Sequence, residues 1–169
     1  MYSLGQGVPQ DYTEAIKWYR KAAEQGDAAA QNHVGLMYAQ GQGVSQNFPE
    51  AAKWWRQPAE IGYAKAQYNL GLSYERGQGA SQDYAEAAKW YRKAADQGDA
   101  QAQFALGVSY GQGRGAPEDY VLAHVWLNLA ASRGGVAGAE GAREALEPMM
   151  TPEQIAEAQR LAREWKPTK

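Results

Sequence analysis

Apolar residues recur along this chain at helical spacing, and the whole pattern repeats every 36 residues. Ala15, Trp18, Ala22 and Ala23 mark one face of a predicted helix over residues 12–25. Trp18 recurs at the 36-residue step as Trp54, Trp90 and Trp126. Each copy follows a residue that can cap a helix, namely Asp11, Asn47, Asp83 and Asp119. A glutamate three residues after the first three caps, Glu14, Glu50 and Glu86, predicts capping boxes.

A second helix is predicted in every period. Its constant residues are Ala30, Val34, Gly35 and Tyr38, with counterparts one period later at Ala66, Leu70, Gly71 and Tyr74. The small residue at 35, 71 and 107 predicts a close approach between paired helices. A Gly-x-Gly turn such as residues 41–43 then ends the helix and leads to the next cap.

A fixed period of this size predicts a solenoid, in which each repeat packs on its neighbours. We expect one domain over residues 1–169, with a partial repeat at 1–26, full repeats at 27–62, 63–98 and 99–134, and a degenerate half-repeat with a capping helix at 135–169. Thr151, Pro152 and Gln154 are expected to open that last helix, which runs to about Trp165. Because the chain starts inside a repeat, we expect it to be a fragment or a start-truncated copy of a longer array. No capping helix precedes its first predicted helix, which we therefore expect to present bare apolar surface.

The repeated phrase resembles a known family. Residues 66–74 (AQYNLGLSY), the turn at 77–79 and residues 83–95 (DYAEAAKWYRKAA) are similar to the Sel1-like repeat, a relative of the tetratricopeptide repeat. The resemblance implies an all-α, right-handed superhelix of antiparallel helix pairs. It places the Leu-Gly-x-x-Tyr helices on the concave side and the tryptophan helices on the convex side. It further implies a non-enzymatic adaptor for proteins or peptides, closest to the cysteine-free bacterial members.

If the Leu-Gly-x-x-Tyr helices line a groove, positions 29, 32, 36 and 39 of the first full repeat point into it. The last three lie 3, 7 and 10 residues after Ala29 on the same helical face, away from the packed stripe of Ala30, Val34 and Tyr38. This face varies between repeats, and its middle is apolar and aromatic. The candidate partner-binding residues are Asn32, Leu36, Lys65, Tyr68, Leu72, Glu75, Gln101, Phe104 and Val108. The alternative is that Leu36, Leu72 and Val108 only pack between adjacent helices.

A ladder of basic residues forms a second candidate surface. Lysines recur at 17, 53 and 89 and arginines at 20, 56 and 92. Each lysine follows a glutamate by three residues, and each arginine precedes an acid by four, at Glu24, Glu60 and Asp96. We therefore expect mutual ion pairing and a solvated convex face rather than a site for an acidic partner or a lipid.

Composition excludes several functions. The formal net charge of −2 argues against nucleic-acid binding. The chain has no cysteine, and no apolar run is long enough for membrane insertion. His33 and His124 show no metal-ligand spacing, and the glycine run at 111–115 is explained by the inter-helix turn. We expect no enzyme activity, no cofactor and no metal.

The sequence thus predicts a protein–protein interaction scaffold that holds a peptide or helix in its concave groove. Two alternatives stay open, which are recognition of a small cell-wall ligand such as a muropeptide, and self-association through the first helix, residues 11–25. We expect a bacterial protein, and the cytoplasm, the periplasm and secretion all agree with the sequence.

Overall fold

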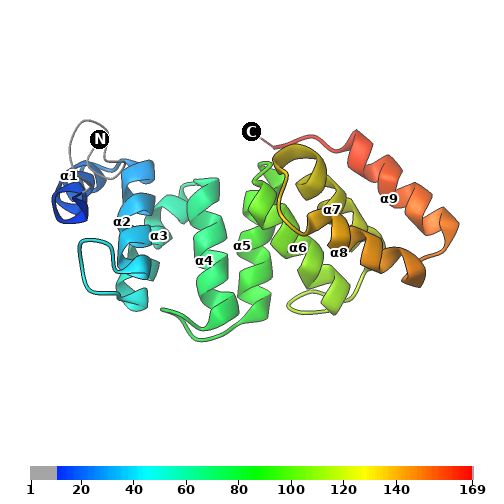
Figure 1. The fold of residues 1–169 in the computed structure, drawn as a ribbon, viewed down its shortest axis with the longest axis horizontal. Coiled ribbons are helices and arrows are strands. Elements are labelled where there is room, and N and C mark those ends of the chain that lie inside the picture. Colours follow the sequence, from blue (N-terminus) through cyan, green and yellow to red (C-terminus); the bar gives the residue numbers. More distant parts are fainter. Residues whose placement is uncertain (1–10, 169) are drawn as a thin grey trace. The chain divides into compact units, whose positions relative to one another are not determined.

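The computed structural model describes residues 11–168, and all regular structure within this range is helical. The chain divides into two compact units, residues 1–82 and 83–169 (Figure 1). Unit 1 contains α1 (Tyr12–Glu24), α2 (Ala28–Gln40), α3 (Phe48–Glu60) and α4 (Ala64–Arg76). Unit 2 contains α5 (Tyr84–Asp96), α6 (Ala100–Gln112), α7 (Tyr120–Gly134), α8 (Ala139–Leu146), a 3-10 turn η2 (Glu147–Met149) and α9 (Pro152–Glu164).

The tryptophan helices α1, α3, α5 and α7 begin at the predicted caps. The side chains of Asp11, Asn47, Asp83 and Asp119 accept hydrogen bonds from backbone N–H groups of the first turn. The predicted capping boxes at α1, α3 and α5 are wrong. Their glutamates instead accept hydrogen bonds from the lysines three residues later, whose ammonium groups compete for the same carboxylates. Within residues 11–168 the reciprocal box forms at Thr151 and Gln154 of α9.

A buried glutamine connects the two helices of each pair, and the sequence analysis did not identify it. The Nε2 groups of Gln31, Gln67 and Gln103 donate to the carbonyl oxygens of Ala23, Ala59 and Ala95, at 3.1, 3.0 and 3.2 Å. Those carbonyls lie in the last turn of the preceding helix, and each also accepts a backbone N–H just after the helix, from Gly26, Gly62 and Gly98. Each glutamine therefore adds a second hydrogen bond at the end of one helix and ties it to the next helix.

Glycines set the close approaches between elements. A Cβ on Gly35 would lie 2.3 Å from Nε1 of Trp55, which confirms the predicted close packing of α2. Gly79, in the turn after α4, has a φ of +86°. A Cβ there would lie 2.3 Å from the carbonyl oxygen of Phe48, so this turn rests on the first residue of α3.

In unit 2, α9 covers α7 as the predicted capping helix. Ala158 is completely buried, and the Trp165 ring meets Trp126 edge-on with centroids 6.1 Å apart. Trp126 is 3% exposed, whereas its counterpart Trp18 on α1 of unit 1 is 56% exposed. The tryptophan ladder is thus buried at α7, half-buried at Trp54 and Trp90, and exposed at α1.

Candidate functional site

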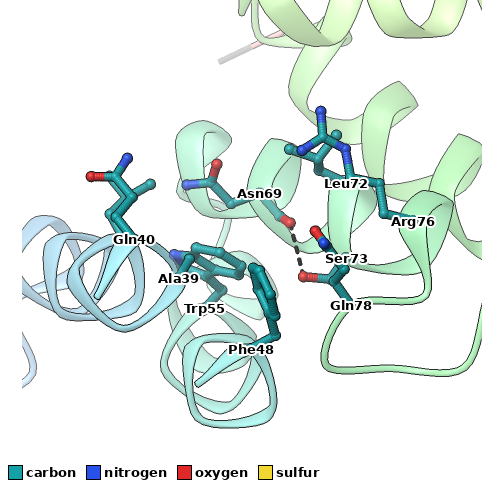
Figure 2. Close-up of a pocket in the computed structure, with 10 residues that line it drawn as sticks. Ala39, Gln40, Phe48, Trp55, Asn69, Leu72, Ser73, Arg76 and Gln78 are labelled. Carbon is teal, nitrogen blue, oxygen red and sulfur yellow. Dashed lines mark hydrogen bonds between the residues drawn. The ribbon is translucent and has the colours of Figure 1, made fainter. Parts of the chain in front are cut away.

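A cavity of about 190 Å³ opens between α2, α3 and α4 of unit 1 (Figure 2). We call it the α2–α4 cavity. In Figure 2, Phe48 and Trp55 of α3 lie between Gln40 of α2 on one side and Arg76 of α4 on the other. Its lining consists of Leu36, Ala39, Gln40, Phe48, Trp55, Asn69, Leu72, Ser73, Arg76 and Gln78.

A second cavity, of about 390 Å³, lies between α1 and α2 and is called the α1–α2 cavity. The rings of Tyr19 and His33 stack beside each other there, with centroids 4.9 Å apart and planes inclined by 23°. The lining residues are Tyr12, Tyr19, His33, Leu36, Met37, Gln40 and Gln42.

The two cavities are built in the same way, one repeat apart. A step of 36 residues carries every residue lining the α1–α2 cavity onto a residue lining the α2–α4 cavity. For example, Tyr12 corresponds to Phe48, and Tyr19 to Trp55. Leu36 and Gln40 line both cavities, so the two adjoin across α2. We call the pair the unit 1 groove.

Hydrogen bonds hold the walls of the α2–α4 cavity in place. The indole Nε1 of Trp55 donates to the backbone carbonyl of Asn32, at 3.2 Å, and fixes the ring against Gly35. The side-chain amide of Asn69 donates to Oδ1 of Asn32, at 2.8 Å. Ser73 Oγ donates to the carbonyl oxygen of Asn69, at 3.3 Å (Figure 2). The polar wall is therefore ordered before any ligand arrives.

The chemistry of the unit 1 groove combines apolar surface with amide groups. Leu36, Leu72, Phe48 and Trp55 supply aliphatic and aromatic surface in the α2–α4 cavity. Gln40, Asn69 and Gln78 add side-chain amides, each of which has both a donor and an acceptor. Such a surface can hold an apolar side chain and pair with the peptide groups beside it.

Of the predicted candidates, Leu36 and Leu72 line the unit 1 groove. The expectation that Asn32 faces the open side is wrong. Its side chain is 3% exposed because Asn69 of α4 packs against it and donates to its Oδ1, while Trp55 of α3 bonds its backbone carbonyl. Lys65 is exposed, and Tyr68 and Glu75 are half-buried; none of these three lines either cavity. Gln101, Phe104 and Val108 lie on α6 of unit 2, the first exposed and the other two half-buried.

Sequence reasoning missed the contribution of the tryptophan helices, which it had placed on the convex side. Phe48 and Trp55 of α3, like Tyr12 and Tyr19 of α1, reach into the cavities. The sequence does contain a signal for these residues. An aromatic residue directly follows the N-cap in all four tryptophan helices, and a second one directly follows the recurring tryptophan in α1, α3 and α5. Read as a second aromatic ladder, these positions predict a contact with the neighbouring helix.

The lysines of the basic ladder are paired with glutamates, as expected. Lys17 and Lys53 pair with Glu14 and Glu50 at 2.6 and 3.1 Å, and Lys89 pairs with Glu86. The hydrogen bond to its glutamate raises the pKa of Lys17, and the same holds for Lys89.

The arginines of the ladder differ from the expectation. Arg20 and Arg92 donate to the hydroxyl groups of Tyr38 and Tyr110 on the next helix, rather than pairing with Glu24 and Asp96 as predicted. Each guanidinium also lies over the ring of that tyrosine, 5.5 Å from its centroid. These two arginines therefore join paired helices.

Within the part of the chain that the structure describes, no group of His, Asp or Glu residues could hold a metal ion. No helix in that part is long and apolar enough to cross a membrane.

A sequence model of the Sel1 repeat matches residues 1–27, 28–63, 64–99 and 100–135. The chain belongs to the Sel1 repeat family. The matched boundaries lie one residue after the predicted ones. No curated protein matches the sequence.

Two solved structures share the Sel1 repeat fold with this chain. One is c5321, a protective antigen of uropathogenic Escherichia coli strains with an SLR fold, at 37% identity and a TM-score of 0.91. That match covers 97% of this chain and 35% of c5321, so the chain spans about a third of its length. The other is a Sel1 repeat protein from Oxalobacter formigenes, at 32% identity and a TM-score of 0.80, covering 99% of this chain and 69% of that one. Sel1 repeat proteins generally mediate protein–protein interactions and are typically non-catalytic scaffolds.

Proposed function

We propose that the protein is an adaptor that holds a peptide segment of a partner protein in the unit 1 groove. The observation that supports this is the repetition of one cavity design in two successive repeats, joined through Leu36 and Gln40. A peptide also repeats its backbone groups at a regular interval, so a repeated set of apolar and amide side chains suits it.

Leu36 and Leu72 are the apolar anchors of this site, and Gln40 and Asn69 bond the peptide backbone. The proposal extends to the candidates that do not line the cavities. These are Lys65, Tyr68 and Glu75 on α4, and Gln101, Phe104 and Val108 on α6.

The test is a selection of random peptides displayed as fusions through their C-termini. The wild-type protein is expected to select peptides rich in apolar residues. A Leu36→Gln/Leu72→Gln double variant should lose most of that binding, because glutamine keeps the helix propensity but removes the apolar surface. Tyr68→Ala in unit 1 and Phe104→Ala in unit 2 test these further candidates separately in the same way.

Ile61 provides the matched control, because it is 66% exposed on unit 1 and lines neither cavity. The Ile61→Gln variant should bind like the wild type. If the double leucine variant, folded by circular dichroism, still binds the selected peptides, the proposal fails. A titration of Trp fluorescence with muropeptides, together with sedimentation at increasing concentration, tests the two alternatives from the sequence.

A further inference from the structure

Arg76 carries the one formal charge among the described residues that line the unit 1 groove. No aspartate or glutamate is among them. The chain holds 19 acidic residues, yet within the described part none forms an ion pair with the Arg76 guanidinium. The cavity therefore presents an uncompensated positive charge, although the whole protein is slightly acidic.

The repeat framework does not require this charge. Arg76 is the last residue of α4, where a cation interacts favourably with the helix dipole. The same position is Gln40 in α2 and Gln112 in α6. All three helices end on a left-handed glycine with nearly the same φ, 68°, 66° and 61°. A neutral glutamine thus allows the same helix end, so the geometry of the C-cap does not require the charge of Arg76.

Arg76 also stands next to apolar surface. It lies one helical turn after Leu72 on α4, and Figure 2 shows both side chains on the same wall of the cavity. A guanidinium binds a carboxylate through paired N–H donors, and this pairing is stronger than one between neutral groups. A ligand that fits both residues carries a carboxylate and an apolar side chain close together.

We infer that the unit 1 groove selects acidic peptide segments, with the side-chain carboxylate of an Asp or Glu on Arg76 and a neighbouring apolar side chain against Leu36 and Leu72. The inference rests on the proposed function and adds the class of ligand to it. The ligand is a peptide rather than a small acid because the α1–α2 cavity continues the site across α2.

The test repeats the peptide selection with three variants. Because the displayed peptides are fused through their C-termini, a selected carboxylate comes from a side chain. The wild-type pool should be enriched in Asp or Glu beside an apolar residue. Arg76→Gln, which installs the residue of the neighbouring repeats, should keep the apolar preference and lose the acidic one. Arg76→Glu should shift the pool toward Lys and Arg.

Arg56→Glu is the matched control, because Arg56 is exposed on α3 and lines neither cavity. This variant should select the same acidic peptides as the wild type. For one selected peptide, replacing its acid by the amide should weaken wild-type binding about fivefold and leave Arg76→Gln binding unchanged.

The outcomes separate the two proposals. An apolar pool without acidic enrichment, or an acidic enrichment that survives Arg76→Glu, overturns the charge inference and leaves the peptide groove intact. If the wild-type protein selects no peptides, or if the selected peptides still bind the Leu36→Gln/Leu72→Gln variant, the proposal of a peptide-binding groove is itself wrong. If Arg76→Glu does not fold, Arg76→Gln still decides the question.

Discussion

Single buried side chains connect the helices of this repeat, and the glutamine ladder is the clearest example. Gln103 is 0% exposed, and its Nε2 donates to the carbonyl of Ala95 at the end of α5. Glutamine is an uncommon core residue, since a buried polar group is costly unless it is bonded. The Nε2 bond offsets part of that cost by linking α6 to the end of α5, whereas Oε1 of Gln103 has no hydrogen-bond partner.

Replacing Gln103 by alanine is therefore expected to destabilise unit 2. The variant removes the Nε2 hydrogen bond to the Ala95 carbonyl, which keeps its bond from the Gly98 N–H, and loses the packing of a fully buried side chain; the lost hydrogen bond alone costs about 1 kcal/mol. Urea unfolding followed by far-UV circular dichroism measures the loss. Gln101 on the same helix is exposed, so Gln101→Ala should change the free energy of unfolding by less than about 0.5 kcal/mol. Equal effects of the two substitutions would show that the hydrogen bond contributes nothing.

At the scale of the element, the turn after each Leu-Gly-x-x-Tyr helix is fixed by contact with the start of the helix before it. The second glycine of the turn carries this contact. Gly79 has a left-handed backbone and no room for a Cβ beside the Phe48 carbonyl. Phe48 lines the α2–α4 cavity, so the same contact helps to place a wall of the proposed site.

Gly79→Ala should therefore be more harmful than an ordinary glycine substitution. Gly62 is the matched control, since it also has a left-handed φ, +100°, but nothing lies within 4 Å of a Cβ built there. Gly62→Ala should cost about 1–2 kcal/mol from the backbone alone. Gly79→Ala should cost about 2 kcal/mol more, because the turn must also move away from α3. Thermal unfolding of the two variants side by side measures the difference, and a cost no larger than that of Gly62→Ala would rule out the contact.

The helices themselves could be predicted from the sequence because their signals are local. Asp11 and its counterparts bond to N–H groups two or three residues away, and Gly77 ends α4 through its own φ. The candidate site was predicted only in part. Leu36 and Leu72 follow from the face of a single helix, whereas the burial of Asn32 and the contribution of Trp55 depend on how α3 packs between α2 and α4. Helical offsets contain no information about that packing.

At the scale of the whole molecule, the two units differ in a buried ionisable group. His124 on α7 of unit 2 is 1% exposed, and neither ring nitrogen has a hydrogen-bond partner. Its Nε2 lies 3.6 Å from Oε1 of Glu147 in η2. The equivalent residues of the two preceding repeats are Ala88 and Ala52. His33, the other histidine, is exposed on α2 of unit 1.

Burial lowers the pKa of His124 below its usual value of 6.5, and this outweighs the opposing effect of the Glu147 carboxylate. The positive charge of Arg143 on α8 also lowers it. The unfolded chain then binds more protons at this residue than the folded chain between the folded pKa and 6.5. The contribution of His124 to stability is thus fully present above pH 6.5 and is lost as the pH falls through that window.

Mild acid is therefore expected to loosen unit 2 before unit 1. Hydrogen exchange, corrected for the intrinsic effect of pH, should show lower protection at about pH 5.5 than at pH 7.5 in α7 to α9, and unchanged protection in α1 to α3. His124→Ala, which installs the residue of the preceding repeats, should remove the difference, whereas His33→Ala should keep it. An equal loss of protection in both units would assign the acid response to groups other than His124. Because stability in a repeat array is a sum of local terms, one buried imidazole can make one unit respond to pH while the other does not.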